Sequence, residues 1–294
     1  MERVIKLDYA YTNKGPIILD KKIYFLTGNK NKISEIMDFV STNTEYFELL
    51  SNQIGFISME LEEIQCENSS DLKIGSDEIS KNKIQKAVCT IKQMVAKNLI
   101  KIESDEVIFI CEDTSLYMSD SINSFPGPYI KFMMPSDIIN FANGIEISNK
   151  KADSRKAFVS SQFSFIKYLN LKSDDVLVND QIVNDQIENM HQMPKVEVVC
   201  GTTQGTISNE LRGLNGWSFD LCFIPCIEEF KQSQLFSKYF EANPDIDISV
   251  LSGKTYSELI DADASQSCRL KNCISHRIKA LDNLFSFIKK FNLI

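Results

Sequence analysis

No stretch of the 294-residue sequence approaches the roughly 20 consecutive apolar residues that a membrane-spanning helix requires. Glycine and proline are scarce, with 11 and 7 residues, while phenylalanine alone contributes 19, which excludes collagen-like and disordered chains. The formal net charge of −8 disfavours a protein whose main task is to grip nucleic acid. The sequence therefore predicts a globular protein that has neither a membrane nor a nucleic acid as its partner.

Histidine is rare, with two residues, and no two of the eight cysteines have the two-residue gap that is typical of a zinc ribbon. Cys111 and Cys200 close apolar runs, where a reduced cysteine packs as a small hydrophobic side chain. The N-terminal residues lack the apolar core of a secretory signal and the arginine- and serine-rich, acid-poor composition of a transit peptide. These features favour a reducing, cytoplasmic setting.

The sequence also lacks the signature motifs of two enzyme classes, the P-loop NTPases and the Ser-His-Asp hydrolases. The Walker pattern Gly-x-x-x-x-Gly-Lys-Ser/Thr is absent, so a P-loop NTPase is not supported. No Gly-x-Ser-x-Gly elbow exists, and Ser275 directly precedes His276, which disfavours a Ser-His-Asp hydrolase.

Hydrophobic periodicity predicts an α/β protein. Short β-branched and aromatic runs indicate strands, and apolar residues at helical spacing indicate helices before and after them in the sequence. The predicted strands cover residues 22–26, 107–111, 158–169, 196–200 and 206–208, and the predicted helices lie around 33–40, 84–95 and 274–288.

The chain is predicted to form a single domain over residues 1–294. Residues 1–20 carry little signal and are interpreted as an N-terminal extension. Two segments, 173–195 and 226–253, are interpreted as insertions. The first is polar and contains a near-repeat, which is typical of a loop, whereas the second carries several aromatic residues and is compatible with a helix packed on the body.

The turn from Thr27 to Lys32 connects a predicted strand to a predicted helix. Small polar residues there expose backbone N–H groups and the positive end of the helix dipole, which together suit a phosphate. Capping of the helix explains the same residues, and the turn alone does not decide between the two interpretations.

Glu112 and Asp113 follow a very apolar strand directly. In α/β sheets, ligands bind at the carboxyl ends of strands, and two adjacent carboxylates are costly to leave unpaired there. A hard cation such as Mg²⁺ would remove this cost, and capping of a helix is the alternative.

The segment from Trp217 to Asp220 places two aromatic rings and a carboxylate together. Aromatic faces stack on nucleobases, and a carboxylate accepts hydrogen bonds from ring N–H groups. Core packing is the alternative for the two rings.

The order of these motifs along the chain resembles that in the inosine triphosphate pyrophosphatases, which hydrolyse non-canonical purine nucleoside triphosphates. The similarity extends from about residue 21 to residue 291 and is interrupted by the two insertions. The motifs that carry it are Thr27-x-Asn29-x-x-Lys32, Glu112-Asp113-Thr114, Phe125-Pro126-Gly127-Pro128-Tyr129-Ile130-Lys131, Phe219-Asp220 with Phe223 and Pro225, Lys254-Thr255-Tyr256-Ser257-Glu258, and Ser275-His276-Arg277 with Ala280 and Leu281.

The resemblance implies an elongated α/β fold, in which a long mixed sheet with flanking helices forms two lobes around a central active-site cleft. It also implies a homodimer. The implied reaction is the cleavage of ITP, dITP or XTP between the α- and β-phosphates, with Mg²⁺ as the cofactor and Mn²⁺ as a possible substitute.

For the phosphate end, the resemblance assigns the triphosphate to the turn and to three lysines. Asp113 would bind the metal and act as, or orient, the base for the attacking water, with Glu112 beside it and Lys32 also in a catalytic role. Glu63 falls where the family places a second metal ligand, with Glu60 and Glu62 as rivals. The implied phosphate-end ligands are Thr27, Gly28, Asn29, Lys32, Lys83, Thr114 and Lys131.

For the base end, the resemblance implies that donors aimed at the C6 carbonyl of the purine reject the C6 amino group of adenine. The implied base-end residues are Trp217, Phe219, Asp220, Lys271, Ser275, His276 and Arg277. The family usually reads Phe-Gly-Trp-Asp-Pro where this chain reads Trp217-Ser218-Phe219-Asp220-Leu221. In an alternative register, Gly216-Trp217 corresponds to the Gly-Trp of the family and Ser218-Phe219 is extra. A pyrophosphatase with a shifted base preference and a nucleotide-binding relative without activity are therefore kept as alternatives.

Overall fold

The computed structural model describes most of the chain, including the strands of the central sheet and the helices packed on it. The described residues are 5–6, 15–43, 46–48, 52–59, 72–149, 155–169, 171, 194–242, 248–262 and 269–291. Glu60, Glu62, Glu63 and nearly all of the first predicted insertion lie outside these ranges.

An eight-stranded mixed sheet forms the centre of the molecule, and its main order is β1-β4-β3-β6-β8-β9-β10. The first four of these strands pair in parallel and the others antiparallel, with β7 pairing β6 separately. Its strands are β1 (Ile5–Lys6), β3 (Ile23–Leu26), β4 (Ile54–Ser58), β6 (Glu106–Met118), β7 (Pro126–Gly127), β8 (Lys156–Leu169), β9 (Glu197–Ile207) and β10 (Phe223–Pro225). Strands β2 (Ile17–Leu19) and β5 (Ile100–Ile102) form a small second sheet.

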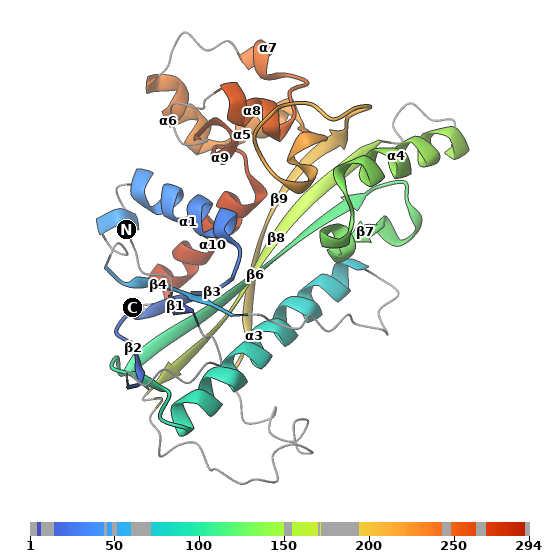
Figure 1. Cartoon of the computed structure of the whole chain (residues 1–294). Coiled ribbons are helices and arrows are strands. Elements are labelled where there is room, and N and C mark those ends of the chain that lie inside the picture. The colour runs from blue at the N-terminus through green and yellow to red at the C-terminus, as the bar shows by residue number, and fades with distance from the viewer. Residues whose placement is uncertain are drawn as a thin grey trace.

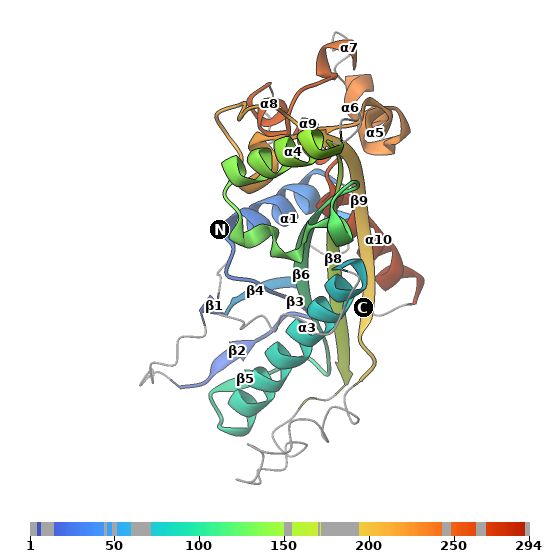
Figure 2. The same ribbon diagram turned by 90° about the vertical axis from the view of Figure 1, so that its right-hand side faces the viewer.

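Helices cover both faces of the long strands. Helix α3 (Leu72–Ala96) packs on β6 and β8 from one side, and α10 (His276–Lys290) packs on β8 and β9 from the other (Figures 1 and 2). Helix α1 (Lys30–Thr42) lies beside α10. This arrangement confirms the predicted mixed sheet with flanking helices.

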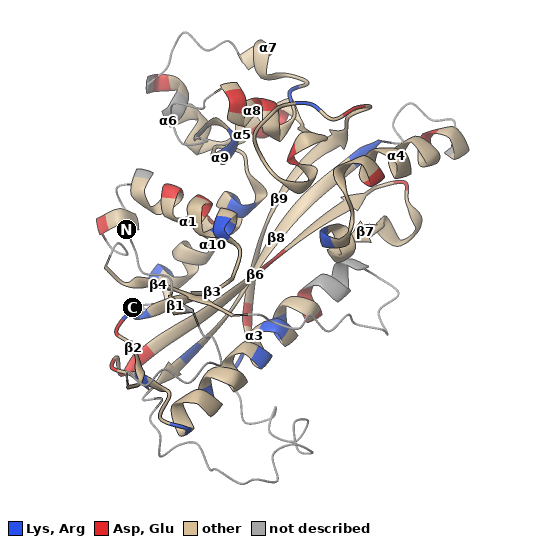
Figure 3. Ribbon diagram, viewed as in Figure 1, with Lys and Arg blue, Asp and Glu red and all other residues tan. Residues whose placement is uncertain are grey.

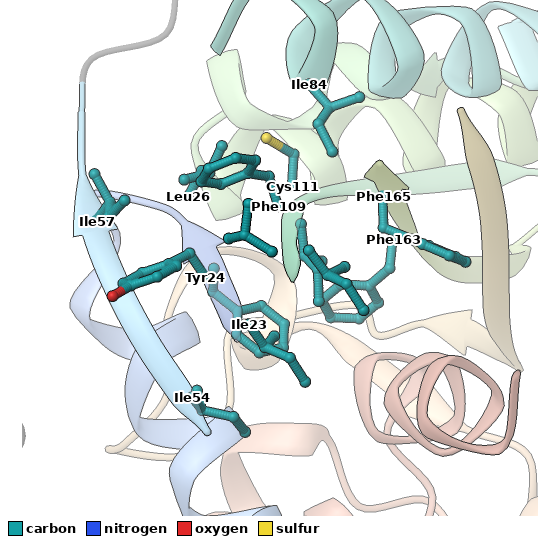
Figure 4. Packing of buried hydrophobic residues seen from close by; sticks show 14 of the residues in the cluster. Ile23, Tyr24, Leu26, Ile54, Ile57, Ile84, Phe109, Cys111, Phe163 and Phe165 are labelled. Atoms are coloured by element: carbon teal, nitrogen blue, oxygen red, sulfur yellow. The ribbon is translucent and has the colours of Figure 1, made fainter. Parts of the chain in front are cut away.

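The buried apolar residues form two clusters, one toward each end of the long strands. The first joins β3, β4 and β6 to α1, α3 and α10, and Figure 4 shows part of it, including Ile23, Phe109 and Phe163. The second joins the far ends of β6, β8 and β9 to the helices above them. These helices are η2 (Pro128–Phe132), α4 (Pro135–Asn149), η5 (Ser218–Leu221), α5 (Ile227–Gln232), α6 (Gln234–Ala242), α7 (Ile248–Leu251), α8 (Tyr256–Ala262) and α9 (Arg269–Asn272). The short helix η1 (Ile122–Ser124) has no buried residue.

The structure extends several of the predicted elements. The predicted strands 196–200 and 206–208 are parts of the single strand β9, which pairs with β8 over most of its length. The second predicted insertion contains helices α5 to α7, and its Phe230 and Phe236 are buried in the second cluster. The predicted N-terminal extension contributes β1 and β2 to the two sheets.

Helix α10 approaches β9 very closely at Gly201. A Cβ atom placed on this residue would lie 2.3 Å from the carbonyl oxygen of His276 and 2.3 Å from the amide nitrogen of Ala280. Only glycine therefore allows the helix to lie at this height above the sheet.

Among the described helices, none has both the length and the apolar character needed to cross a bilayer.

Candidate active site

A cleft of about 300 Å³ opens where β3 ends, between the two hydrophobic clusters. It brings together residues from β3, α1, α3, β6, η2 and η5, which lie far apart in the sequence. Most of the predicted phosphate-end residues line it, together with two of the predicted base-end residues. The predicted residues in its lining are Thr27, Gly28, Asn29, Lys32, Lys83, Glu112, Asp113, Thr114, Lys131, Trp217 and Phe219.

The turn that follows β3 caps helix α1 and lines the cleft. The Asn29 carboxamide oxygen accepts hydrogen bonds from the amides of Asn31 at 2.9 Å and Lys32 at 3.4 Å, and the Thr27 hydroxyl accepts one from the Asn29 amide at 3.2 Å. The capping interpretation is thus confirmed. It does not exclude phosphate binding, because the exposed Gly28 lies at the rim of the cleft, beside the positive end of the helix.

Glu112 and Asp113 lie in the middle of β6, so the prediction that they follow the end of a strand was wrong. Strand β6 continues to Met118 because it pairs with β8 over its whole length. Its parallel neighbour β3, however, pairs with it only as far as Ile110. The two acidic residues therefore lie directly beyond the carboxyl end of β3, which is where the cleft opens.

The two carboxylates point to opposite faces of β6, as adjacent residues of a strand must. Glu112 forms an ion pair with Lys32 of α1 and accepts hydrogen bonds from Thr114 Oγ1 at 2.6 Å and Ser161 Oγ at 2.5 Å. Asp113 pairs instead with Lys83 of α3 at 3.4 Å. Figure 3 shows the acidic positions of β6 between basic positions of α3 and α1.

Both lysines also donate to the same backbone atom. The carbonyl oxygen of Glu112 lies 3.3 Å from Lys32 Nζ and 3.2 Å from Lys83 Nζ. This carbonyl lies beyond the last residue of β6 that pairs with β3. The two ammonium groups consequently meet at one point of the cleft from opposite faces of the sheet.

Burial and charge act differently on the two carboxylates. Burial raises the pKa of Asp113 above its ordinary value, and the charge of Lys83 offsets this only in part. For Glu112, the charges of Lys32 and Arg277 outweigh burial and lower the pKa well below its usual range. Burial also lowers the pKa of Lys32, whereas Asp113 holds the pKa of Lys83 above its ordinary value in spite of burial.

Asp113 offers one carboxylate oxygen suited to a hard cation. Its Oδ2 atom is buried and has no hydrogen-bond partner among the described residues. Mg²⁺ is commonly bound by one or two carboxylates together with substrate phosphates and water, and the donor set on this face of β6 fits that pattern. The described residues contain no group of three or more His, Cys, Asp or Glu side chains that could hold a metal alone.

At the other end of the cleft, five predicted residues do not line it. Asp220, Lys271, Ser275, His276 and Arg277 are each no more than 2% exposed. The ammonium of Lys271 lies 2.9 Å from a carboxylate oxygen of Asp220 and 2.9 Å from a carboxylate oxygen of Glu35. The donors predicted to read the base are thus paired with acidic residues of the chain itself.

Glu35 was not predicted from the sequence as part of this arrangement. It lies in α1, one turn after Lys32, and it pairs with both Lys271 and Arg277. Burial alone would raise its pKa, but the charges of Arg277 and Lys271 outweigh that effect and lower the pKa to about 2. The only signal in the sequence was an acidic residue directly before Ile36 of the apolar helix face.

We refer to Glu35, Asp220, Lys271 and Arg277 as the buried ion cluster. Its two carboxylates balance its two cations, and Arg277 extends it toward the phosphate end through Thr114 Oγ1 at 3.0 Å and Glu112 Oε1 at 3.5 Å. A continuous series of ion pairs therefore runs beneath the cleft from one end to the other.

Two aromatic rings separate the cleft from the buried residues. The Trp217 ring lies 5.5 Å from the guanidinium carbon of Arg277, and the Phe219 ring packs on the His276 ring at 5.7 Å between centroids. Both rings also line the cleft. Burial, together with the charges of Arg277 and Lys271, lowers the pKa of His276 well below its ordinary value, so the ring is neutral.

The remaining predicted residues lie at the edges of this arrangement. Lys131 is exposed at the end of η2, with its ammonium 4.6 Å from the Phe132 ring. Ser275 occupies the N-cap position of α10, but its hydroxyl makes no capping hydrogen bond.

Comparison with known proteins gives consistent matches along the chain. The model of the Ham1 family matches residues 23–238. A protein of Pyrococcus horikoshii named dITP/XTP pyrophosphatase is 24% identical over 91% of this chain and 97% of its own length. The inosine triphosphate pyrophosphatase of Leishmania major is 23% identical over 91% of this chain and 92% of its own length. The structure of a HAM1 protein from Coxiella burnetii aligns with 92% of this chain and 99% of its own, at 17% identity and a TM-score of 0.49.

Proposed function

Because the chain belongs to the Ham1 family, we propose that it hydrolyses the non-canonical purine nucleoside triphosphates ITP, dITP and XTP to a nucleoside monophosphate and pyrophosphate. The observation that carries this proposal is the meeting of Lys32 and Lys83 at the Glu112 carbonyl, beside the unpartnered carboxylate oxygen of Asp113. Relatives that align over nine tenths of this chain are named for pyrophosphatase activity on dITP, XTP or ITP.

At the phosphate end, the chain supplies positive charge from several directions. Lys32 and Lys83 neutralise the charge that develops on the leaving pyrophosphate, and Lys131 adds a third cation from η2. The turn at Thr27, Gly28 and Asn29 places the positive end of α1 against the remaining phosphate oxygens.

Asp113, through its free Oδ2 atom, would hold Mg²⁺, with Mn²⁺ as a substitute. When bound, the metal neutralises phosphate charge and lowers the pKa of coordinated water. Asp113 itself orients the attacking water or accepts its proton. Its carboxylate projects from the face of β6 opposite to that of Glu112, so the two acidic residues have separate roles. Glu112 holds Lys32 and Arg277 rather than the metal, since both are its ion-pair partners.

At the base end, Trp217 and Phe219 offer aromatic faces to the purine, and Asp220, Lys271, Ser275, His276 and Arg277 supply the polar groups behind them. A carbonyl at C6 accepts from such donors, whereas the amino group of adenine would leave them unpaired, at a cost of about 1–3 kcal/mol for each buried group.

The test is incubation with Mg²⁺ and ITP, XTP, GTP, ATP or CTP, with released pyrophosphate measured separately from orthophosphate. We expect pyrophosphate from ITP and XTP and little from ATP. Lys32→Ala should lose at least 100-fold in turnover. The matched control is Lys30→Ala, which removes an exposed lysine from the same helix turn. Release of orthophosphate alone, or equal turnover of ATP and ITP, would contradict the proposal.

A shifted base preference is the second candidate, and the sequence of η5 is the observation that favours it. Trp217 takes the position where relatives usually carry Phe, so the larger ring changes the space left for a base. In that case pyrophosphate is released from a nucleotide other than ITP and XTP in the same assay.

The assembly and the cellular location remain predictions. A homodimer is expected from the resemblance, and light scattering of the purified protein would measure its mass. A cytoplasmic location is expected from the cysteine usage, and fluorescence microscopy of a tagged chain would test it.

A further inference from the structure

We propose that Trp217 is a lid that covers Arg277 in the free protein and is displaced by a purine base. This inference rests on the proposed function, because it concerns how a base reaches the buried ion cluster. The indole lies between the guanidinium of Arg277 and the cleft, with one part lining the cleft and the ring 5.5 Å from the guanidinium carbon.

The separation between these two groups leaves no space for a ligand. A distance of 5.5 Å is that of a direct cation–π contact, so a flat base cannot lie between indole and guanidinium. Arg277 is 1% exposed, and it does not line the cleft. A base that contacts Arg277 must therefore move the Trp217 ring first.

Several polar atoms at the base end have no hydrogen-bond partner among the described residues. Ser275 Oγ and both ring nitrogens of His276 are buried and form no hydrogen bond with the described residues. The indole Nε1 of Trp217 is buried and unpartnered in the same way. A buried polar group without a partner is unfavourable, so the covered arrangement leaves hydrogen bonds for an incoming base to satisfy.

The backbone on both sides of the lid is unusual. Gly216 has a φ of +109° and Ser218 a φ of +56°, so Trp217 lies between two residues with left-handed backbone. For Ser218 this conformation is strained, because its Cβ atom approaches the following carbonyl oxygen. The covered form thus stores strain at Ser218, and the displacement releases it by turning the Ser218 backbone out of the left-handed region together with the ring.

The anchor of the lid joins it to the buried ion cluster. Asp220 accepts a hydrogen bond from the Trp217 backbone amide at 3.2 Å and forms the ion pair with Lys271 at 2.9 Å. The indole can therefore swing toward the cleft while its own backbone amide remains tied to the residues that read the base.

The lid can be observed directly, because Trp217 is the only tryptophan in the chain. Its indole N–H gives a single NMR signal, and the rate at which this proton exchanges with water reports its burial. IMP should raise this rate at least tenfold, because displacement moves the indole edge into the water-filled cleft. Inorganic tripolyphosphate, which has no base, should leave the rate unchanged.

The alternative arrangement, in which the base stacks on a stationary indole, gives a different result. The indole N–H then stays buried, and its exchange rate is unchanged or lower although calorimetry shows that IMP binds. That result overturns the lid, and release of pyrophosphate from ITP in the same preparation would show that the proposed function still holds. An equal rise with tripolyphosphate also overturns the lid. If the protein neither binds IMP nor hydrolyses ITP, both the lid and the proposed function are overturned.

Ser218→Gly tests the stored strain separately. Glycine removes the penalty of the left-handed backbone, stabilises the covered form and should weaken IMP binding about fivefold. The matched control is Ser124→Gly, because Ser124 has a φ of +55° and does not line the cleft. Unchanged IMP binding in Ser218→Gly, or equal weakening in both variants, overturns the role given to Ser218.

Discussion

At the phosphate end of the cleft, Lys32 and Lys83 line the open space beside Asp113, whereas at the base end Lys271 and Arg277 lie buried behind Trp217. Both ends contain acidic partners for their cations. The phosphate end leaves a carboxylate oxygen of Asp113 unpartnered, while each charged side chain of the buried ion cluster pairs with another.

This difference matches the two kinds of ligand group. A triphosphate carries several negative charges, so it competes well with carboxylates for lysines that line the cleft and needs a preformed positive surface. A base is neutral and gains little from charge, so its readers must be held in place by the protein itself. The comparison teaches that charge serves binding at one end and positioning at the other.

The largest expected effect is at the phosphate end, with Asp113→Asn. An amide removes the charge that the metal and the attacking water require, so kcat for ITP should fall at least 100-fold. The burial that raises the pKa of Asp113 also predicts that activity in the parent is lost on the acid side at a higher pH than for an ordinary aspartate. Steady-state kinetics with circular dichroism as a folding control measures both. Near-normal turnover would remove Asp113 from the mechanism.

Glu35→Gln should destabilise the buried ion cluster at the base end of the cleft. The folded pKa of about 2 lies below the ordinary 4.5, so Glu35 stabilises the protein above pH 4.5 and loses this contribution as the pH falls toward 2. At pH 7 the variant should lose about 3 kcal/mol of unfolding free energy. The deficit should narrow at pH 3.

Urea unfolding at the two pH values measures this difference, and Glu103→Gln, at an exposed position, is the control. An equal deficit at pH 7 and pH 3 would show that the charge of Glu35 is not what stabilises the cluster.

Arg277→Ala should sharpen the comparison, because it acts on selection more than on turnover. Loss of the guanidinium should lower the ratio of kcat/KM for ITP over ATP about tenfold, which corresponds to one buried charged hydrogen bond. Competition between the two nucleotides in one reaction measures the ratio. If the ratio is unchanged, the base is read elsewhere in the cleft.

The smallest effect is expected for Lys131→Ala. Because Lys131 is an exposed residue, its charge is screened by water, so KM for ITP should rise only about threefold while kcat stays within twofold. A large fall in kcat would instead place Lys131 at the reacting phosphate.

The regular elements could be predicted from the sequence, because their hydrophobic periods are local properties. Ile33, Ile36 and Val40 predicted α1, and the run from Val107 to Cys111 predicted part of β6, whereas the mixed sheet was implied by the family resemblance. The position of Glu112 and Asp113 within β6 could not be predicted, because it depends on pairing with β8 some 50 residues later.

The composition of the candidate site was largely predictable, but its pairings were not. The resemblance indicated Asp220, Lys271 and Arg277, while nothing in the sequence showed that they are buried around Glu35. An ion pair between residues more than 200 positions apart leaves no periodic signal. The sequence thus predicted which groups meet and not which of them are already occupied.

The close approach of α10 to β9 at Gly201 limits how this protein can vary. The first residues of that helix are His276 and Arg277, so the height of the helix above the sheet determines how far these side chains reach. Any side chain at position 201 lifts the helix and withdraws both residues together. Under the proposed function, a change of substrate range is therefore accessible through a backbone contact on the side of the sheet away from α3, without altering any residue that lines the cleft.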